Sequence, residues 1–315
     1  MTDSAASLPT SLADANGVTV VPMWVTIGGE QSRDTELDMA RVIAGLGEGF
    51  STSGPAPGEL VDAANRADQG DGVVLLTISR RMSGSYESAR LAAGLLEEQG
   101  ARKEAGKEAG KETVAVVDTG TAAGAEGLVV LAASRAAHEG LPVEGVVAAA
   151  EGAARKVRLV ATLPSLEHLA RGGRVPGIAA LGARWLGLQP VFEFRQGKVK
   201  ALRPARGRRL ACQRIVALWA ADLDEQLRRG SMLHVSALHA LEPEIAEDLL
   251  RQVRTYVEPA TAFVGSFSPV MVAHTGPGLA GLAWWWEAKP REEPDGPEKS
   301  NETGATGARS GSRGG

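Results

Sequence analysis

Two short apolar runs constrain the fold of this chain more than any other feature. "GVVLLTI" (residues 72–78) and "TVAVVDT" (113–119) are apolar almost throughout, have the length of strands, and are each followed by a helical pattern. Continuous apolar strands are typical of a sheet that is buried on both faces. An earlier run, "GVTVVPMWVTI" (17–27), predicts one or two further strands. The alternation of strands and helices predicts an α/β domain with a mainly parallel sheet flanked by helices.

The pattern restarts after residue 158 with a different mixture of elements. "RLVATL" (158–163) predicts a strand, "PVFEFRQGKVKAL" (190–202) a hairpin that turns at Gln196 and Gly197, and "MLHVSALHA" (232–240) another strand. Residues 210–230 predict one long amphipathic helix, and "SPVMVAHTGPG" (268–278) a strand followed by a loop. A hairpin beside such strands predicts a second α/β domain with a mixed sheet.

We therefore expect three parts. They are an N-terminal α/β domain over residues 1–158, a C-terminal α/β domain over 159–286, and a disordered tail over 287–315, where apolar residues are almost absent. The repeat "KEAGKEAGKE" (103–112) is interpreted as a solvated helix extension or loop.

The composition excludes several classes of protein. The chain has 315 residues and a formal net charge of −4, which argues against a generally basic nucleic-acid binder. A single cysteine, Cys212, cannot form an intramolecular disulfide. The first residues lack the features of a signal peptide, and no apolar run of about 18 residues could span a membrane. These observations predict a cytoplasmic protein without a membrane span, and leave transient membrane contact open.

Metal and nucleotide sites have no support in the pattern. The five histidines form no HExxH motif and have no cysteine partners, so we expect no metal site. Neither GxxxxGK[ST] nor a GxGxxG fingerprint after a strand is present, so no nucleotide cofactor is expected.

Four short polar loops stand out instead: "TSGPAPGE" (52–59), "RRMSGSYES" (80–88), "RGGRVPG" (171–177) and "AHTGPG" (273–278). The second precedes a helix, where backbone N–H groups can bind an anion. In a doubly wound sheet such loops line the ligand crevice at the carboxyl ends of the strands. Taken singly, each also fits a helix cap or a structural histidine.

The collinear set of motifs resembles the DegV family of bacterial fatty-acid-binding proteins, from about residue 2 to residue 286. The matching segments are "TDSAASLP", "TSGPAPGE", "SGSYESARLAAGLL", "VVDT", "LEHLARGGRV", "QPVFEFRQGKV", "RGRR" and "HTGPG". The resemblance implies a fatty acid whose tail is buried in the N-terminal domain and whose carboxylate meets polar residues between the domains.

Carried onto this chain, the resemblance implies a set of site residues. The carboxylate would be bound by Thr52, Ser53, Ser83, Arg174, His274 and Thr275. Gly84, Gly276 and Gly278 would shape the loops, and Arg206, Arg208 and Arg209 would face a partner. That partner would be an ATP-dependent fatty acid kinase, to which this chain presents the acyl carboxylate without catalysing a reaction itself.

The chain also departs from the family pattern. Met1 directly precedes the "TDS" motif, so the first strand is shortened or the true start lies upstream. "SGSY" and "TSGPAP" replace the usual "SGTY" and "TSQPSP" but retain a hydroxyl group at the positions to which the carboxylate contacts are assigned. Arg80 and Arg81 stand where the family is commonly small and polar, and "DTGTAAGAEG" (118–127) keeps only the outline of its equivalent.

Two other functions compete with fatty-acid binding. In the first, Ser83 is the nucleophile and His274 the base of a serine hydrolase that acts on acyl esters. However, "RMSGS" is not GxSxG, and the sequence provides no evident acid partner for His274. In the second, the "RGRR" segment reads nucleic acid, which the acidic overall charge disfavours.

Overall fold

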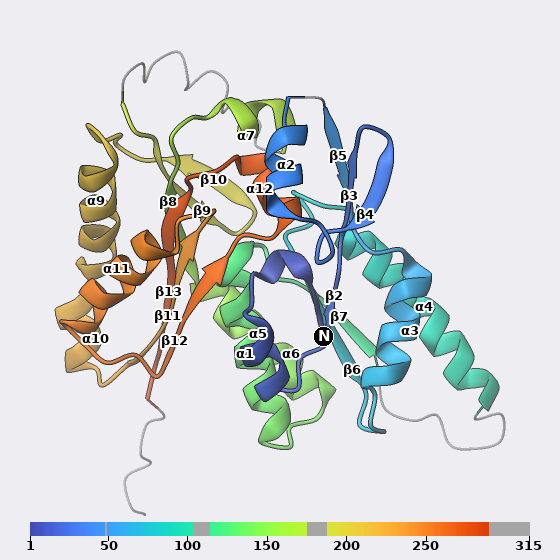
Figure 1. Ribbon diagram of the computed structural model, residues 1–315. Coiled ribbons are helices and arrows are strands. Elements are labelled where there is room, and N and C mark those ends of the chain that lie inside the picture. Colours follow the sequence, from blue (N-terminus) through green and yellow to red (C-terminus); the bar gives the residue numbers. More distant parts are fainter. Residues whose placement is uncertain (48, 104–113, 175–187, 290–315) are drawn as a thin grey trace, which may run out of the picture.

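The computed structural model describes residues 1–47, 49–103, 114–174 and 188–289 (Figure 1). The N-terminal part is built on a four-stranded parallel sheet in the order β2-β1-β6-β7. Its strands are β1 (Thr2–Asp3), β2 (Val20–Val21), β6 (Val73–Thr77) and β7 (Val114–Asp118). The two continuous apolar runs are therefore adjacent strands of a parallel sheet, as their composition predicts.

Helices cover both faces of this sheet. On one face lie α3 (Pro57–Ala67) and α4 (Ser85–Lys103), and on the other lie α5 (Ala123–His138) and α6 (Val143–Lys156), with the short α1 (Thr10–Ala15) beside them (Figure 1). The pair α5 and α6 also contacts the second sheet, so these two helices form a layer between the two sheets.

The second sheet is six-stranded and mixed, in the order β10-β9-β8-β13-β11-β12, which confirms the predicted fold class. Its strands are β8 (Arg158–Thr162), β9 (Val191–Arg195), β10 (Lys198–Ala201), β11 (Met232–His239), β12 (Thr261–Ser266) and β13 (Ala280–Glu287). The outer face is covered by α9 (Arg208–Ala220), α10 (Leu223–Arg228) and α11 (Pro243–Arg254). The hairpin β9–β10 turns at Gln196 and Gly197, as predicted.

Three expectations need correction. The long helix predicted for residues 210–230 is two helices, α9 and α10, separated at Ala221 and Asp222. The apolar run before His274 is not a strand but the helix α12 (Pro269–Thr275). Glu287, assigned to the tail, is the last residue of β13 and bonds to Arg135 and His234.

A small antiparallel sheet, in the order β4-β3-β5, was not anticipated. Its strands are β3 (Trp24–Ile27), β4 (Glu30–Arg33) and β5 (Phe50–Ser53). Together with α2 (Met39–Gly45), α7 (Glu167–Gly172) and α12, it gathers at one end of the molecule (Figure 1). Segments from both halves of the chain therefore meet at this end.

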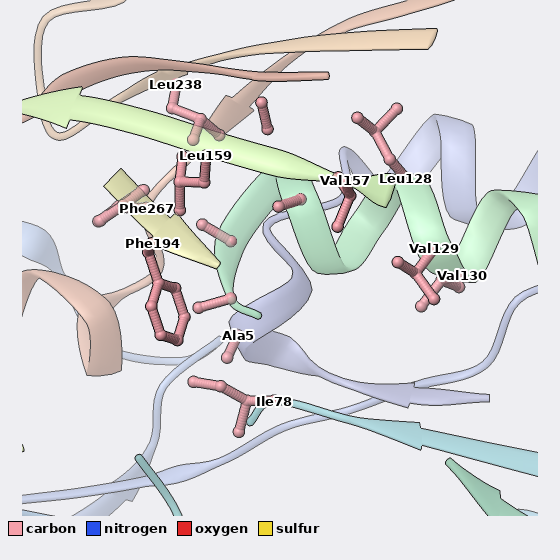
Figure 2. Packing of buried hydrophobic residues seen from close by; sticks show 14 of the residues in the cluster. Ala5, Ile78, Leu128, Val129, Val130, Val157, Leu159, Phe194, Leu238 and Phe267 are labelled. Atoms are coloured by element: carbon pink, nitrogen blue, oxygen red, sulfur yellow. The ribbon is translucent and has the colours of Figure 1, made fainter. Parts of the chain in front are cut away.

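One hydrophobic core joins the two halves. Figure 2 shows Leu159 and Leu238 of the six-stranded sheet in one buried cluster with Leu128 of α5 and with Ala5 and Ile78 of the N-terminal part. A second contact comes from the tip of the β9–β10 hairpin, where the backbone N–H of Gly197 donates to the carbonyl of Gly120 at 2.6 Å.

Some predicted segments lie outside the described residues. They are the repeat beyond Lys103, the loop after Arg174, and the chain after Lys289. The domain boundary near residue 158 remains a prediction. Within the described ranges, no helix is both long and apolar enough to cross a membrane.

Candidate functional site

His274 lies in the last turn of α12, and the local sequence explains why. Ser268 and Pro269 begin the helix, with proline at a position where its missing N–H costs nothing. Gly276 ends it with φ +71°, and its N–H donates to the carbonyl of Val272. A side chain at Gly276 would also place its Cβ 2.3 Å from the ring of His168. Both the positive φ and this close approach therefore favour glycine at the position.

The imidazole of His274 touches elements from both halves of the chain. Its Nε2 is hydrogen-bonded to Oγ1 of Thr52 on β5 at 2.7 Å, and its ring meets that of Phe50 edge-on at 5.3 Å between centroids. Phe50 and Thr52 are two apart on β5 and therefore share a face of the strand. A Cβ at Gly172, the last residue of α7, would lie 2.8 Å from Nδ1, so that glycine permits the close approach.

The charge state of His274 follows from this environment. Burial, and then the positive charge of Arg174, lower the pKa of His274 to about 4. The ring is therefore neutral at neutral pH, with one nitrogen as donor and the other as acceptor. Nδ1 is buried without a hydrogen-bond partner among the described residues. His274 thus has one ring nitrogen free to receive or donate a hydrogen bond.

Ser83 is held in the loop between β6 and α4. Its Oγ lies 2.9 Å from Oγ of Ser85 and accepts the N–H of Ser85, the first residue of α4. A Cβ at Gly54 would lie 2.5 Å from Oγ of Ser85. Because Gly54 is two residues after Thr52, this close approach places the Thr52 and Ser83 loops side by side.

Arg174 supplies positive charge at the exposed rim. Its guanidinium donates to the carbonyl of Gly172 at 2.8 Å, just after the left-handed Gly173 ends α7. The charge is near enough to lower the pKa of His274. An anion bound beside both would be attracted to the guanidinium group and would counteract its lowering of the His274 pKa.

Other predicted residues lie apart from this group. Ser53 is exposed and, as the neighbour of Thr52 on a strand, faces away from His274. The hydroxyl of Thr275 bonds to the carbonyls of Met271 and Gly276, within its own helix end. Gly84 is exposed, and a Cβ there would meet nothing within 4 Å, so no close contact requires glycine.

The three predicted arginines of the "RGRR" segment differ in their contacts. Arg208 forms an ion pair with Glu242 and donates to the carbonyl of Gly278, whose φ is +83°. Arg208 therefore anchors the end of the His274 loop. Arg206 and Arg209 are exposed, and Arg206 lines a surface groove of about 640 Å³ together with Leu210.

A small cavity lies behind Ser85, between α3, α4 and the four-stranded sheet. Its volume is about 10 Å³, which is room for roughly one water molecule. The lining residues are Met1, Thr2, Asp3, Pro55, Leu60, Leu75, Leu76, Thr77, Ser85 and Ala89. Around it α3 and α4 pack with small side chains, including Ala63, Ala64, Ala92 and Ala93.

The "TDS" motif forms a buried acidic network that the sequence did not reveal. Asp3 accepts the N–H groups of Ala5 and Ile78, and Glu126 on α5 accepts the hydroxyl of Thr2. Burial raises the pKa of Asp3 to about 6 and that of Glu126 well above its usual range. Oε2 of Glu126 is buried without a hydrogen-bond partner among the described residues, and the negative charge of Asp3 lies near enough to raise the pKa of Glu126 further.

Several contacts of the site could not be read from the sequence. Phe50, Gly54, Gly172 and Ser85 shape it through long-range packing. Gly54, Gly172 and Ser85 lie in the quoted loops, whereas Phe50 had no local signal. The described contacts pair Ser83 with Ser85 and His274 with Thr52, and thus give no serine–histidine pair for a hydrolase. Among the described residues, no cluster of three His, Cys, Asp or Glu could hold a metal ion.

Comparison with known proteins places this architecture in a family. Residues 1–287 match the family model described as "Uncharacterised protein, DegV family". A DegV domain-containing protein of Streptomyces coelicolor is 31% identical over 90% of this chain and 96% of its own length. One from Deinococcus radiodurans is 32% identical over 90% and 96%.

Solved structures agree. A DegV family protein from Thermus thermophilus, described by its fatty acid binding, has a TM-score of 0.76 and 30% identity over 90% of this chain and 97% of its own. A stearic acid-binding protein from Eubacterium ventriosum has the same fold, with a TM-score of 0.77 and 24% identity over 90% and 96%. The chain therefore belongs to the DegV family.

Proposed function

We propose that this protein binds a long-chain fatty acid, with the carboxylate at Thr52, Ser83, Arg174 and His274. The observation that carries the proposal is the partly buried His274, which lies beside the cation of Arg174. Its Nε2 is paired with Thr52, and its Nδ1 has no hydrogen-bond partner among the described residues. The related Thermus thermophilus protein, described by its fatty acid binding, supports the ligand class.

The acyl chain would enter the N-terminal half between α3, α4 and the sheet. The cavity behind Ser85 marks the entrance, and the alanines of α3 and α4 allow these helices to separate around a chain. A sixteen-carbon acid buries about 14 methylenes at roughly 0.8 kcal/mol each, or on the order of 11 kcal/mol. Hydroxyl donors and the nearby cation offset the cost of burying the carboxylate.

Beyond binding the fatty acid, the protein acts in this proposal as a cytoplasmic carrier that catalyses no reaction itself. In this role a partner kinase binds ATP and phosphorylates the carboxylate that the carrier presents. Exposed Arg206 and Arg209, beside the groove next to Leu210, are the surface we assign to that partner. No contact among the residues that the structure describes favours the hydrolase alternative.

Ligand binding is tested directly by lipid extraction and mass spectrometry of gently purified protein, followed by titration with labelled palmitate. Thr52→Val and Ser83→Ala should each weaken binding about ten- to a hundredfold, since each removes one hydrogen bond to a charged group. Ser53→Ala is the matched control, because Ser53 is exposed on the other face of β5. Protein that neither retains a fatty acid nor binds palmitate would refute the proposal.

A substitution of His274 distinguishes binding of the fatty acid from presentation of its carboxylate to the kinase. His274→Ala should reduce the rate of kinase-coupled acyl phosphate formation by about tenfold or more. The affinity for palmitate should fall less, because the apolar tail dominates binding. Comparing palmitate affinity with the kinase-coupled rate checks this, and an unchanged rate in the variant would contradict the role of His274.

A further inference from the structure

The surface of the cavity behind Ser85 is mostly apolar, and Leu60, Leu75 and Ala89 contribute to it. Four residues with polar side chains, Thr2, Asp3, Thr77 and Ser85, also line it. A buried polar side chain must be paired or it costs free energy.

Three of the four polar side chains already have partners. The hydroxyl of Thr2 donates to Glu126, and the carboxyl of Asp3 accepts two backbone N–H groups. Ser85 Oγ bonds to Ser83 Oγ. Thr77 is different: its side chain is 4% exposed, and its Oγ1 has no hydrogen-bond partner among the described residues.

The direction of the Thr77 side chain follows from the strand. Val73 and Leu75 of β6 belong to the apolar cluster of α3 and α4. Residues two apart on a strand share a face, so Thr77 points into the same layer as these two residues. Thr77 therefore lines the cavity from the sheet, at the end of β6 nearest the serine loop.

The position of this hydroxyl along a bound ligand can also be inferred. Ser85 lines the cavity and is one hydrogen bond, of 2.9 Å, from Ser83. Ser83 is one of the residues to which the proposed function assigns the carboxylate. Thr77 and Ser85 would then face the first few carbon atoms of the chain and not its methyl end.

We propose that the site prefers fatty acids that carry a hydroxyl group close to the carboxylate, as in 2- and 3-hydroxy acids, and that Thr77 recognises this group. The inference rests on the proposed fatty-acid site. A methylene beside Thr77 leaves a buried hydroxyl unpaired, whereas a ligand hydroxyl can both donate to it and accept from it.

The test is a competition titration of the whole protein with palmitate, 2-hydroxypalmitate, 3-hydroxypalmitate and 16-hydroxypalmitate. One of the first two hydroxy acids should bind about fivefold more tightly than palmitate, the size expected for one buried hydrogen bond. The 16-hydroxy acid should show no gain, because its hydroxyl is at the far end.

Variants identify the residue that reads the hydroxyl. Thr77→Val should abolish the preference and leave palmitate binding unchanged or tighter, whereas Thr77→Ser should keep it. Thr121→Val is the control, since Thr121 is also buried with an unpaired hydroxyl but is not among the residues that line the cavity. A preference that survives in Thr77→Val would overturn the assignment.

The wild-type protein alone also decides the matter if Thr77→Val does not fold. Palmitate binding without any preference for the 2- or 3-hydroxy acid refutes this inference and leaves the proposed function intact. Failure of all four acids to bind refutes both.

Discussion

At the scale of single residues, the most unusual feature is the carboxyl pair of Asp3 and Glu126. Both side chains are almost completely buried, with 2% and 0% exposed. A carboxyl group whose pKa is raised on folding stabilises the protein fully below its unfolded pKa, near 4. That stability is lost as the pH rises through the folded pKa, which is about 6 for Asp3 and higher for Glu126.

Glu126→Gln should therefore stabilise the protein clearly at about pH 8 and much less at about pH 5, because glutamine has no charge to bury. The glutamine can still accept from Thr2. Denaturant unfolding of both proteins at each pH checks this, with the exposed Glu139→Gln as control.

The comparison is made between variants at a fixed pH because His274 titrates in the opposite sense. Its lowered pKa costs stability as the pH falls from 6.5 towards 4. Parallel curves for the wild type and Glu126→Gln would contradict the role of the pair.

The sequence could identify site residues by type but not by geometry. Thr52, Ser83, Arg174 and His274 were selected from four separate loops, and the structure brings Thr52 and Arg174 to His274. Ser53 was selected with Thr52 because the two are adjacent, yet adjacency on a strand places them on opposite faces. Only knowing that residues 50–53 form a strand could have separated them.

At the scale of elements, the β9–β10 hairpin connects the two halves of the molecule. Gly197 at its tip has φ +70°, and a Cβ there would lie 2.7 Å from Cδ of Arg81. The tip therefore rests against the same loop that carries Ser83.

Gly197→Ala should lower the free energy of unfolding by about 2 kcal/mol, partly from backbone strain and partly from the clash. Combining it with Arg81→Ala removes the clash with Arg81, leaves the approach to Oγ of Ser79 at 3.1 Å, and should restore part of the loss. Urea unfolding of the four proteins of this cycle measures the coupling, and strictly additive effects would show that the contact is absent.

The helix α12 shows why one element was predicted wrongly. A short apolar run is compatible with a buried strand or a buried helix, and the period of hydrophobicity cannot distinguish them. The pair Ser268 and Pro269 was the available signal, because a serine followed by proline is typical of a helix start. By contrast, the apolar runs of β6 and β7 were correctly predicted as strands. They are adjacent in one parallel sheet, and a strand buried on both faces of such a sheet is apolar throughout.

At the scale of the whole molecule, the shared core predicts a single unfolding transition. The largest cluster of buried residues takes members from both halves, including Leu128, Leu159 and Leu238 (Figure 2). Neither half can lose this cluster without exposing apolar surface of the other.

Five of the six tryptophans follow residue 158, so tryptophan fluorescence reports mainly on the second half. Far-UV circular dichroism reports on both halves. The two denaturation curves should coincide, and two separated midpoints would show that the halves unfold independently.

The layer of α5 and α6 between the two sheets has a consequence for how such chains can evolve. Gly124 and Gly127 of α5 leave no room for a side chain, since a Cβ would lie 2.2 Å from Ser236 and 2.8 Å from the carbonyl of Ala6. The absence of side chains at these two glycines thus lets α5 pack closely against β11 of the second sheet and against the short 3-10 helix Ser4–Ala6 that follows β1. Exchange of halves between distant relatives would separate surfaces that have been shaped against each other. Inheritance of both halves as one unit is the outcome that this geometry favours.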